Sequence, residues 1–156
     1  KEYIKPQMGN IILDGKVIGT HDGVAYYTIG QRHGLDIKTG GGPYYVAEKK
    51  FDTNTLVVSR GADDPRLSQQ RVVLKEVNWI SGQAPTESIR VIAKPRYRHP
   101  GAPATVKVSN VNGQMLNVCI FDAPERALTP GQSVVFYQNS ENGLEVLGGG
   151  IIDNLT

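Results

Sequence analysis

Five cationic side chains lie in one part of the sequence that contains no acidic residue. Between Ser88 and Phe121 there is no aspartate or glutamate, whereas this basic stretch contains Arg90, Lys94, Arg96, Arg98 and Lys107. Tyr97 stands between two of the arginines. Guanidinium and ammonium groups bind phosphate, and a ring among them can contact a base or sugar, so the pattern indicates a nucleic-acid surface. A solvated strand face explains the same pattern, and the residues by themselves leave both interpretations open.

Glycine-rich segments are the next candidates, because such loops can bind phosphate. Residues 9–17 resemble a phosphate loop, but the spacing is one residue too long and a valine stands where the motif requires Ser or Thr. A hairpin turn at Asp14-Gly15 explains this segment better. Two glycine runs, 40–42 and 148–150, lack a following helix that would direct amide groups at a phosphate. We expect the first to be a loop and the second a β-bulge or a close approach between backbones.

Histidine and cysteine chemistry is not indicated. The three histidines have neither metal-ligand spacing nor cysteine neighbours, so the sequence predicts no metal site. His21-Asp22 could form an acid–base pair, although a polar turn before a strand is the simpler interpretation. The single Cys119 lies among apolar residues with no cation beside it, which predicts an inert packing residue. The residues alone therefore predict a binding module without a catalytic residue.

The elements that must position the basic stretch are predicted to be strands, which makes the fold class all-β. Eighteen glycines and nine prolines favour short elements and tight turns. Hairpin turns are predicted at Asp14-Gly15, Asn112-Gly113 and Asn142-Gly143. One helical turn is possible at residues 65–70. The strand-like runs are 11–13, 16–18, 24–29, 44–47, 56–59, 104–108, 116–121, 133–137 and 145–147.

Polar and turn-forming residues cluster at 61–70 and predict a boundary between two β modules, 1–70 and 71–156. The two modules share turn chemistry, but we find no internal repeat. With 39% hydrophobic and 21% charged residues, the chain is expected to be soluble and globular. The absence of an export leader and the single cysteine fit the cytoplasm. The net charge of +2 does not by itself indicate a nucleic-acid partner.

Several motifs follow one another in the chain. They are GTHDG at 19–23, YTIGQRHGL at 27–35, PYYV at 43–46, RYR at 96–98, TPGQSVVFY at 129–137 and LGGGII at 147–152. In their order and spacing they resemble the C-terminal part of the tRNA-specific 2-thiouridylases, the MnmA or TrmU family. One departure is that His99 stands where the family has a glutamine after its Arg-Tyr-Arg.

The resemblance implies an enzyme in three parts. An N-terminal domain uses ATP with magnesium to adenylate the wobble uridine of tRNA, and two cysteines there pass on sulfur from a persulfide donor. A small central β domain and a six-stranded-type β-barrel, similar to the second domain of elongation factors, hold the tRNA. Residues 1–70 and 71–156 correspond to these two β domains. Residues 3–6 resemble the stretch after the second catalytic cysteine, so the resemblance implies no catalytic residue, cofactor or metal in this chain, and neither DNA nor membrane as a partner.

The tRNA contacts that carry over from the family are Arg96, Tyr97 and Gln132. Strict alternation along a strand would put Arg96 and Tyr97 on opposite faces, so we expect an irregularity there, and Pro95 is a reason for one. The YTIGQR segment is expected to pack the central domain against the catalytic domain. The alternative function is a freestanding β-barrel of the translation-factor type that binds RNA or protein and has no enzymatic activity.

Overall fold

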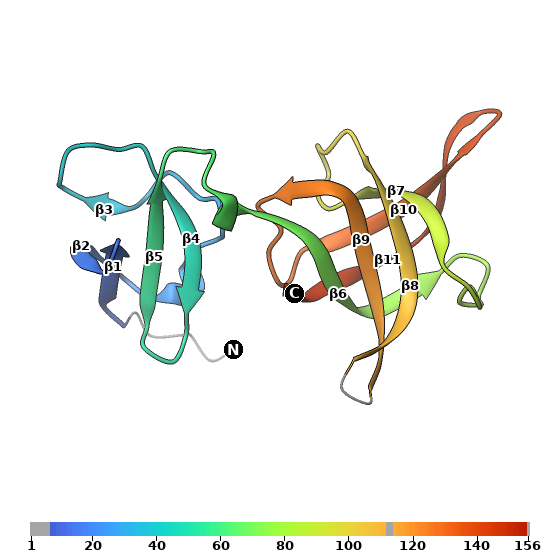
Figure 1. Ribbon diagram of the computed structural model, residues 1–156, viewed down its shortest axis with the longest axis horizontal. Coiled ribbons are helices and arrows are strands. Elements are labelled where there is room, and N and C mark those ends of the chain that lie inside the picture. The colour runs from blue at the N-terminus through green and yellow to red at the C-terminus, as the bar shows by residue number, and fades with distance from the viewer. Residues whose placement is uncertain (1–6, 112–113, 156) are drawn as a thin grey trace. The chain divides into compact units, whose positions relative to one another are not determined.

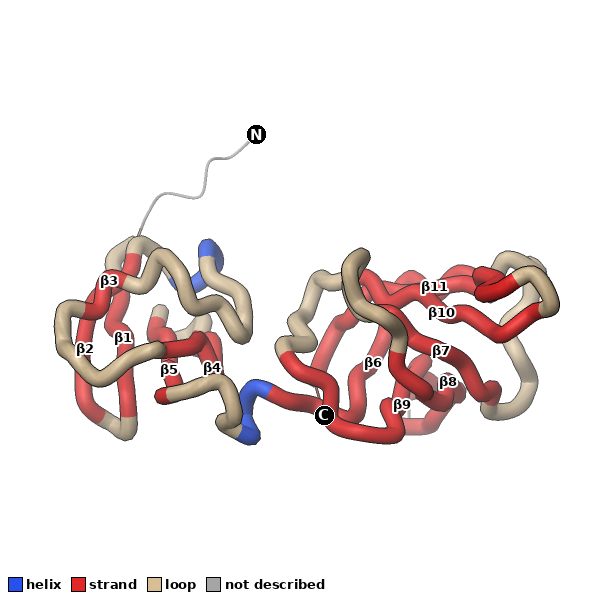
Figure 2. The backbone as a smooth tube through the Cα atoms, turned by 90° about the horizontal axis from the view of Figure 1, so that it is seen from above, coloured by secondary structure: helices blue, strands red, loops and turns tan. Residues whose placement is uncertain are grey.

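The computed structural model describes residues 7–111 and 114–155, and within them almost every element is a strand (Figure 1). The turn predicted at Asn112-Gly113 lies outside the described residues. The chain forms two compact units, Lys1–Ser68 and Gln69–Thr156. The helices of the described residues are short 3-10 turns, Val24–Tyr26 and Pro65–Leu67, and appear as blue segments in Figure 2. The all-β prediction is confirmed.

The first unit is a five-stranded sheet in the order β3-β2-β1-β5-β4. Its hairpin β1–β2 turns at Asp14 and Gly15, which have φ values of 47° and 78°, as the Asp-Gly signal predicts. β1 pairs in parallel with β5, and the remaining pairs are antiparallel. The strands are β1 Gly9–Leu13, β2 Lys16–His21, β3 Asp36–Ile37, β4 Tyr44–Lys50 and β5 Thr55–Arg60.

The strand predicted at 24–29 is wrong. Residues Val24–Tyr26 form a 3-10 turn, whose first amide donates to the side-chain oxygen of Asn54 at 3.1 Å. The apolar character of this segment reflects burial instead, because Val24 and Tyr27 are buried in the core of the unit. Apolar side chains thus supply the core without pairing into the sheet.

The segment 27–37 covers both edges of this sheet. At one edge Gly30 N–H donates to Val46 O at 2.7 Å, and Val46 N–H donates to Gln31 O at 3.0 Å. At the other edge β3 pairs with β2. The segment packs apolar side chains against the core of its own unit, namely Tyr27, Ile29, Leu35 and Ile37. Its apolar residues therefore pack within the first unit, and packing of the YTIGQR segment against the catalytic domain stays a prediction.

The second unit is a closed barrel in the order β10-β11-β6-β9-β8-β7. β6 was missed by the sequence pattern, because its polar first half precedes the buried residues 72–74. The helical turn predicted at 65–70 is shorter than expected and ends at Leu67, directly before this strand. The strands are β6 Ser68–Trp79, β7 Ile89–Lys94, β8 Ala102–Val111, β9 Gln114–Arg126, β10 Ser133–Ser140 and β11 Gly143–Leu155.

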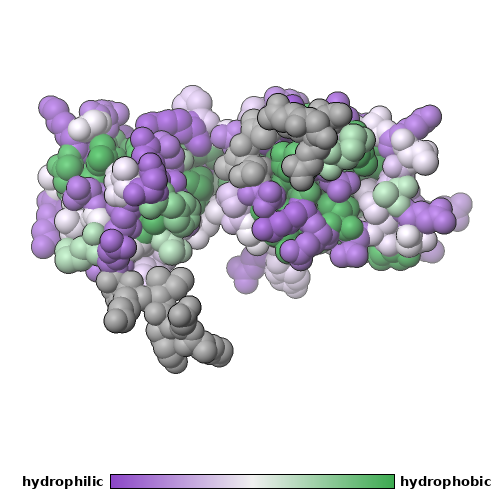
Figure 3. Space-filling model, turned by 90° about the horizontal axis from the view of Figure 1, so that it is seen from below, coloured by the Kyte–Doolittle hydropathy of each residue, from purple (hydrophilic) through white to green (hydrophobic). Residues whose placement is uncertain are grey.

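The exposed residues of the two units are mixed in character. On the face shown in Figure 3, hydrophobic residues lie in small groups between hydrophilic ones. Within the described part of the chain, no helix has the length and apolar character needed to span a membrane.

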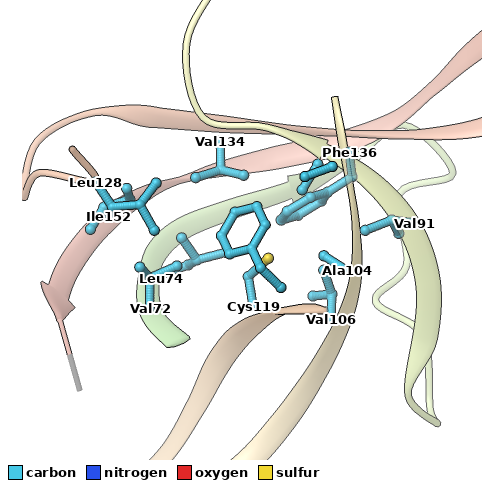
Figure 4. Close-up of a cluster of buried hydrophobic side chains, with 13 residues drawn as sticks. Val72, Leu74, Val91, Ala104, Val106, Cys119, Leu128, Val134, Phe136 and Ile152 are labelled. Atoms are coloured by element: carbon cyan, nitrogen blue, oxygen red, sulfur yellow. The ribbon is translucent and has the colours of Figure 1, made fainter. Parts of the chain in front are cut away.

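Side chains from all six strands fill the interior of the barrel (Figure 4). Phe121 and Phe136 are among the largest fully buried side chains, and Trp79 stacks on Phe136 with ring centroids 5.4 Å apart. Cys119 lies within this cluster. The barrel thus has its own hydrophobic core, which supports the outer face of β7 and β10.

The glycine run 148–150 lies in β11 and confirms the predicted bulge and close approach. The register of β11 shifts against β6 between Gly149 and Ile151. A Cβ on Gly149 would lie 2.7 Å from the carbonyl oxygen of Val134, and one on Gly148 would collide with the carbonyl oxygen of Asn78. These glycines let the neighbouring backbones approach, which is a structural role.

Candidate nucleic-acid interface

After the end of β7, residues 96–98 of the basic stretch are no longer part of the barrel wall. Lys94 is the last residue of the strand, and the buried Pro95, which has no N–H to donate to a ladder, follows it. Residues 96–98 form a turn in which His99 N–H donates to Arg96 O at 3.0 Å. Strand alternation therefore does not apply to Arg96 and Tyr97, and both are exposed. The irregularity predicted at Pro95 is confirmed.

A second turn, Thr129–Gln132, leads into β10. Gln132 N–H donates to Thr129 O at 3.1 Å, and Thr129 N–H donates to the Gln132 side-chain oxygen Oε1 at 3.2 Å. Gly131 N–H donates to Ile152 O and Ile152 N–H donates to Gln132 O, both at 2.8 Å. Four hydrogen bonds, three of them to Gln132, thus close this turn at the start of β10 and hold it against β11.

The pairing of β10 with β7 brings the two turns together, since Val135 lies opposite Lys94. Between them is a groove with a volume of about 540 Å³. The groove contains all three residues that the family resemblance indicated as tRNA contacts. Its lining is Lys94, Pro95, Arg96, Tyr97, Gln132, Ser133, Val135 and Tyr137.

The groove combines cations with aromatic rings and has no carboxylate in its lining. The Lys94 ammonium lies 4.9 Å from the centroid of the Tyr137 ring. Tyr97 is 98% exposed. In the described part of the chain neither Arg96 nor Arg98 forms an ion pair. An anionic ligand with flat rings fits these groups, because cations attract the charge and tyrosines offer stacking surfaces.

The rest of the basic stretch is less cationic than the sequence suggested. Arg90 forms two hydrogen bonds of 2.7 Å with the Asp122 carboxylate, which raise the pKa of Arg90 and lower that of Asp122. His99 Nε2 lies 3.0 Å from a carboxylate oxygen of Glu125. Both acids belong to β9, beyond the acid-free span of sequence. Arg90 is therefore neutralised by Asp122 of β9, and two of the remaining cations of the basic stretch, Lys94 and Arg96, line the groove.

Tyr137 and Ser133 are groove residues that the sequence reasoning missed. The signal that could have found them is the alternation along residues 133–137. Val134 and Phe136 are fully buried in the barrel, so the residues between and beside them face outward.

His21 has a structural role. It is 3% exposed, its Nδ1 accepts from Gly23 N–H at 3.0 Å, and its Nε2 lies 3.1 Å from the Asn54 carbonyl oxygen, to which it donates. Burial lowers the pKa of His21 below its ordinary value, which favours this neutral tautomer. Both ring nitrogens are occupied, so His21 does not form an acid–base pair with Asp22. The polar turn predicted at His21-Asp22 is correct only in part, because His21 is the last residue of β2, Asp22 is in a bend after it, and a 3-10 turn follows rather than a strand.

The packing position predicted for Cys119 is confirmed, and its inertness stays a prediction. Its side chain is fully buried in the barrel core, and burial raises the pKa of its thiol to about 12. Among residues 7–111 and 114–155, no group of three His, Cys, Asp or Glu side chains could hold a metal ion.

Two family models match the chain. Residues 1–60 match a tRNA methyl transferase PRC-barrel domain, and residues 69–152 match an aminomethyltransferase beta-barrel domain. The chain is 46% identical to tRNA-specific 2-thiouridylase MnmA 2 of Geobacillus kaustophilus and 43% identical to MnmA of Marinobacter nauticus, in each case over 98% of its length. It covers 40% and 38% of those two proteins. The chain thus spans about two fifths of the length of these curated relatives.

Proposed function

Because the chain belongs to the MnmA family of tRNA-specific 2-thiouridylases, we propose that its second unit holds tRNA for such an enzyme. The observation that supports this most directly is the convergence of Arg96, Tyr97 and Gln132 on one groove. Lys94 adds a second cation and Tyr137 a second ring. Phosphate contacts from arginine and lysine position an RNA, and tyrosines stack on its bases or contact its sugars.

The chemistry of the whole protein is part of the same proposal. It converts the wobble uridine of tRNA to 2-thiouridine by ATP-dependent adenylation and transfer of persulfide sulfur, and ATP with magnesium and the sulfur donor act in the part of the relatives that this chain does not span. The described residues do not fit these groups. The glycine run 148–150 packs against strand backbones, the run 40–42 precedes a strand rather than a helix, and the thiol of Cys119 is buried.

The experiment measures binding of an unmodified tRNA transcript to the 156-residue chain at several salt concentrations. Arg96→Ala is expected to weaken binding by roughly 1–3 kcal/mol and to reduce the log–log salt slope by about one, because a phosphate contact releases a counterion. Gln132→Ala is expected to weaken binding without changing that slope, since an amide releases no counterion.

Lys107→Ala is the control, because it removes the same charge from the same basic stretch outside the groove. It should change affinity and slope less than Arg96→Ala. If Arg96→Ala binds like the native chain, or Lys107→Ala has the same effect, the groove is not the RNA site. If the native chain binds no tRNA, the tRNA-holding proposal fails and the alternative of a barrel that binds protein gains support.

A further inference from the structure

The two units contain the same local turn, built on the sequence Thr-x-Gly-Gln. In the first unit Gln31 N–H donates to Thr28 O at 3.0 Å, and Thr28 N–H donates to Gln31 Oε1 at 3.0 Å. Gly30 N–H and Gln31 O pair with Val46 on β4. In the second unit Thr129, Gly131 and Gln132 form the same four hydrogen bonds, with Ile152 on β11 in the place of Val46.

This equivalence identifies what the glutamine oxygen does. In both turns Oε1 accepts the threonine N–H and closes the turn, so one of its two lone pairs is used within the protein. The two glutamines differ in the partner of the amide nitrogen, Nε2. Gln31 Nε2 donates to His33 O at 2.8 Å. In the described part of the chain Gln132 Nε2 has no hydrogen-bond partner, and it is not among the buried polar atoms left unsatisfied. Its two N–H groups are accessible from the groove.

Every charged or amide group that lines the groove is consequently a donor. Arg96 and Lys94 have no acceptor atom, and the atom of the Gln132 amide without a hydrogen-bond partner in the described residues is the donor Nε2. Two main-chain acceptors beside them are occupied, since Arg96 O accepts from His99 N–H and Gln132 O from Ile152 N–H. The hydroxyls of Ser133, Tyr97 and Tyr137 can donate as well as accept.

We propose that the groove reads the sugar–phosphate backbone of RNA and not its base sequence, with Gln132 acting there purely as a hydrogen-bond donor. This inference rests on the proposed function. Phosphate oxygens present acceptors at every nucleotide, whereas base edges present sequence-dependent mixtures of donors and acceptors. Donors bind the phosphate oxygens of every nucleotide and also the acceptor edge of guanine, so transcripts of different sequence decide between these two contacts. The tyrosines contact sugars or stack on any base. The barrel therefore holds different tRNAs equally, and selection among them lies outside this groove.

The experiment uses two tRNA transcripts that share the fold and the wobble uridine but differ in every stem base pair. Each is titrated with the 156-residue chain and with two variants, Gln132→Glu and Gln132→Ala. Glu retains an acceptor for Thr129 N–H and loses both donors, whereas Ala loses the donors and the acceptor. Glu also adds a negative charge, which repels phosphate by itself, so Ser133→Asp, which adds the charge at the neighbouring groove residue and keeps both Gln132 donors, is the control. A donor role makes Gln132→Glu the more damaging of these two changes.

We expect the native chain to bind both transcripts with similar affinity, and Gln132→Glu to weaken both by about tenfold or more, the effect of losing a hydrogen bond to a charged group. Two results would overturn the inference while leaving tRNA binding intact. One is a preference of about tenfold for one transcript that Gln132→Ala abolishes, and the other is native affinity in Gln132→Glu. Failure of the native chain to bind either transcript would instead overturn the proposed function. Gln31→Glu, which makes the same change in the equivalent turn outside the groove, should leave the relative affinities unchanged.

Discussion

Tyr97 has the largest exposed fraction of the large apolar side chains in the described part of the chain. Its ring stands on a turn between two arginines, and Pro95 keeps that turn outside the barrel ladder. The ring of Tyr97 is in contact with water on both faces. Stacking on a base would bury one of these apolar faces, which is energetically favourable. Tyr97 is thus not part of the core, and its contact with RNA is part of the proposed function.

Substitutions at Tyr97 separate stacking from hydrogen bonding. Tyr97→Ala is expected to weaken tRNA binding by about 1–3 kcal/mol, because the stacking surface is lost, whereas Tyr97→Phe should retain most of the affinity. Phe51→Ala, at an exposed ring in the first unit, is the matched control. Titration of fluorescent tRNA gives the comparison. Equal losses for Tyr97→Phe and Tyr97→Ala would show that the hydroxyl, and not the ring, makes the contact.

His21 predicts a pH dependence of stability. Its pKa is lowered in the folded chain, so the unfolded chain binds its proton more tightly. The neutral His21 ring stabilises the folded chain. This contribution to the free energy of unfolding is fully present above the ordinary pKa of about 6.5 and is lost as the pH falls toward the lower pKa of the folded state. Urea unfolding at pH 7.5 and pH 5.5 should show a smaller acid-induced loss for His21→Asn than for the native chain. If His21→Asn loses as much stability in acid as the native chain, other titratable groups cause the loss.

At the scale of elements, the pairing of β7 with β10 creates the groove. Lys94 and Val135 are partners in that ladder, and each lies beside a turn that leaves the barrel wall. The turn after β7 is set by Pro95, and the turn before β10 is closed by the side chain of Gln132. The geometry of the groove thus depends on β10 and on its neighbour β11, where Gly149 lies opposite Val135.

Gly149→Ala should destabilise the barrel. The new Cβ would lie 2.7 Å from the Val134 carbonyl oxygen, and relief requires the strands to move apart, at a cost of about 1–3 kcal/mol. Gly40→Ala is the control, because a Cβ there meets nothing within 4 Å. Chemical denaturation should give a lower midpoint for Gly149→Ala only. Native stability of this variant would mean that the β10–β11 approach is not tight.

At the scale of the molecule, binding and chemistry are proposed to lie in different parts of the whole protein. The chain has two units, each with a hydrophobic core of its own, and spans about two fifths of the length of its curated relatives. The groove belongs to the second unit. The first unit uses its equivalent turn to cover a sheet edge, since the Gln31 amide is bonded to its own loop.

The 156-residue chain is expected to form no 2-thiouridine when incubated with tRNA, ATP and a persulfide donor. Its single cysteine is buried with a thiol pKa of about 12, so a thiolate is not available to carry sulfur. Analysis of nucleosides from the treated tRNA provides the measurement, and a reaction without protein is the blank. Thiolation above this blank would refute the assignment of the chemistry to the rest of the protein.

Short-range features were determined by the sequence itself. The Asp14-Gly15 turn follows from the positive φ that these residue types tolerate, and the break at Pro95 follows from a missing N–H. The all-β class follows from such turns between short apolar runs. The apolar run 24–29 was misread because burial and strand pairing select the same residue types, and only the packing of Val24 and Tyr27 distinguishes them.

The charge and shape of the groove were decided by the tertiary structure. Arg90 and Arg96 look alike in the sequence, but Asp122 comes from β9 to neutralise only Arg90. Gln132 and Arg96 line one groove because β10 pairs with β7. The Arg90–Asp122 ion pair and the pairing of β7 with β10 join residues far apart in the chain, and electrostatic partners are set by distance in space, which strand pairing establishes.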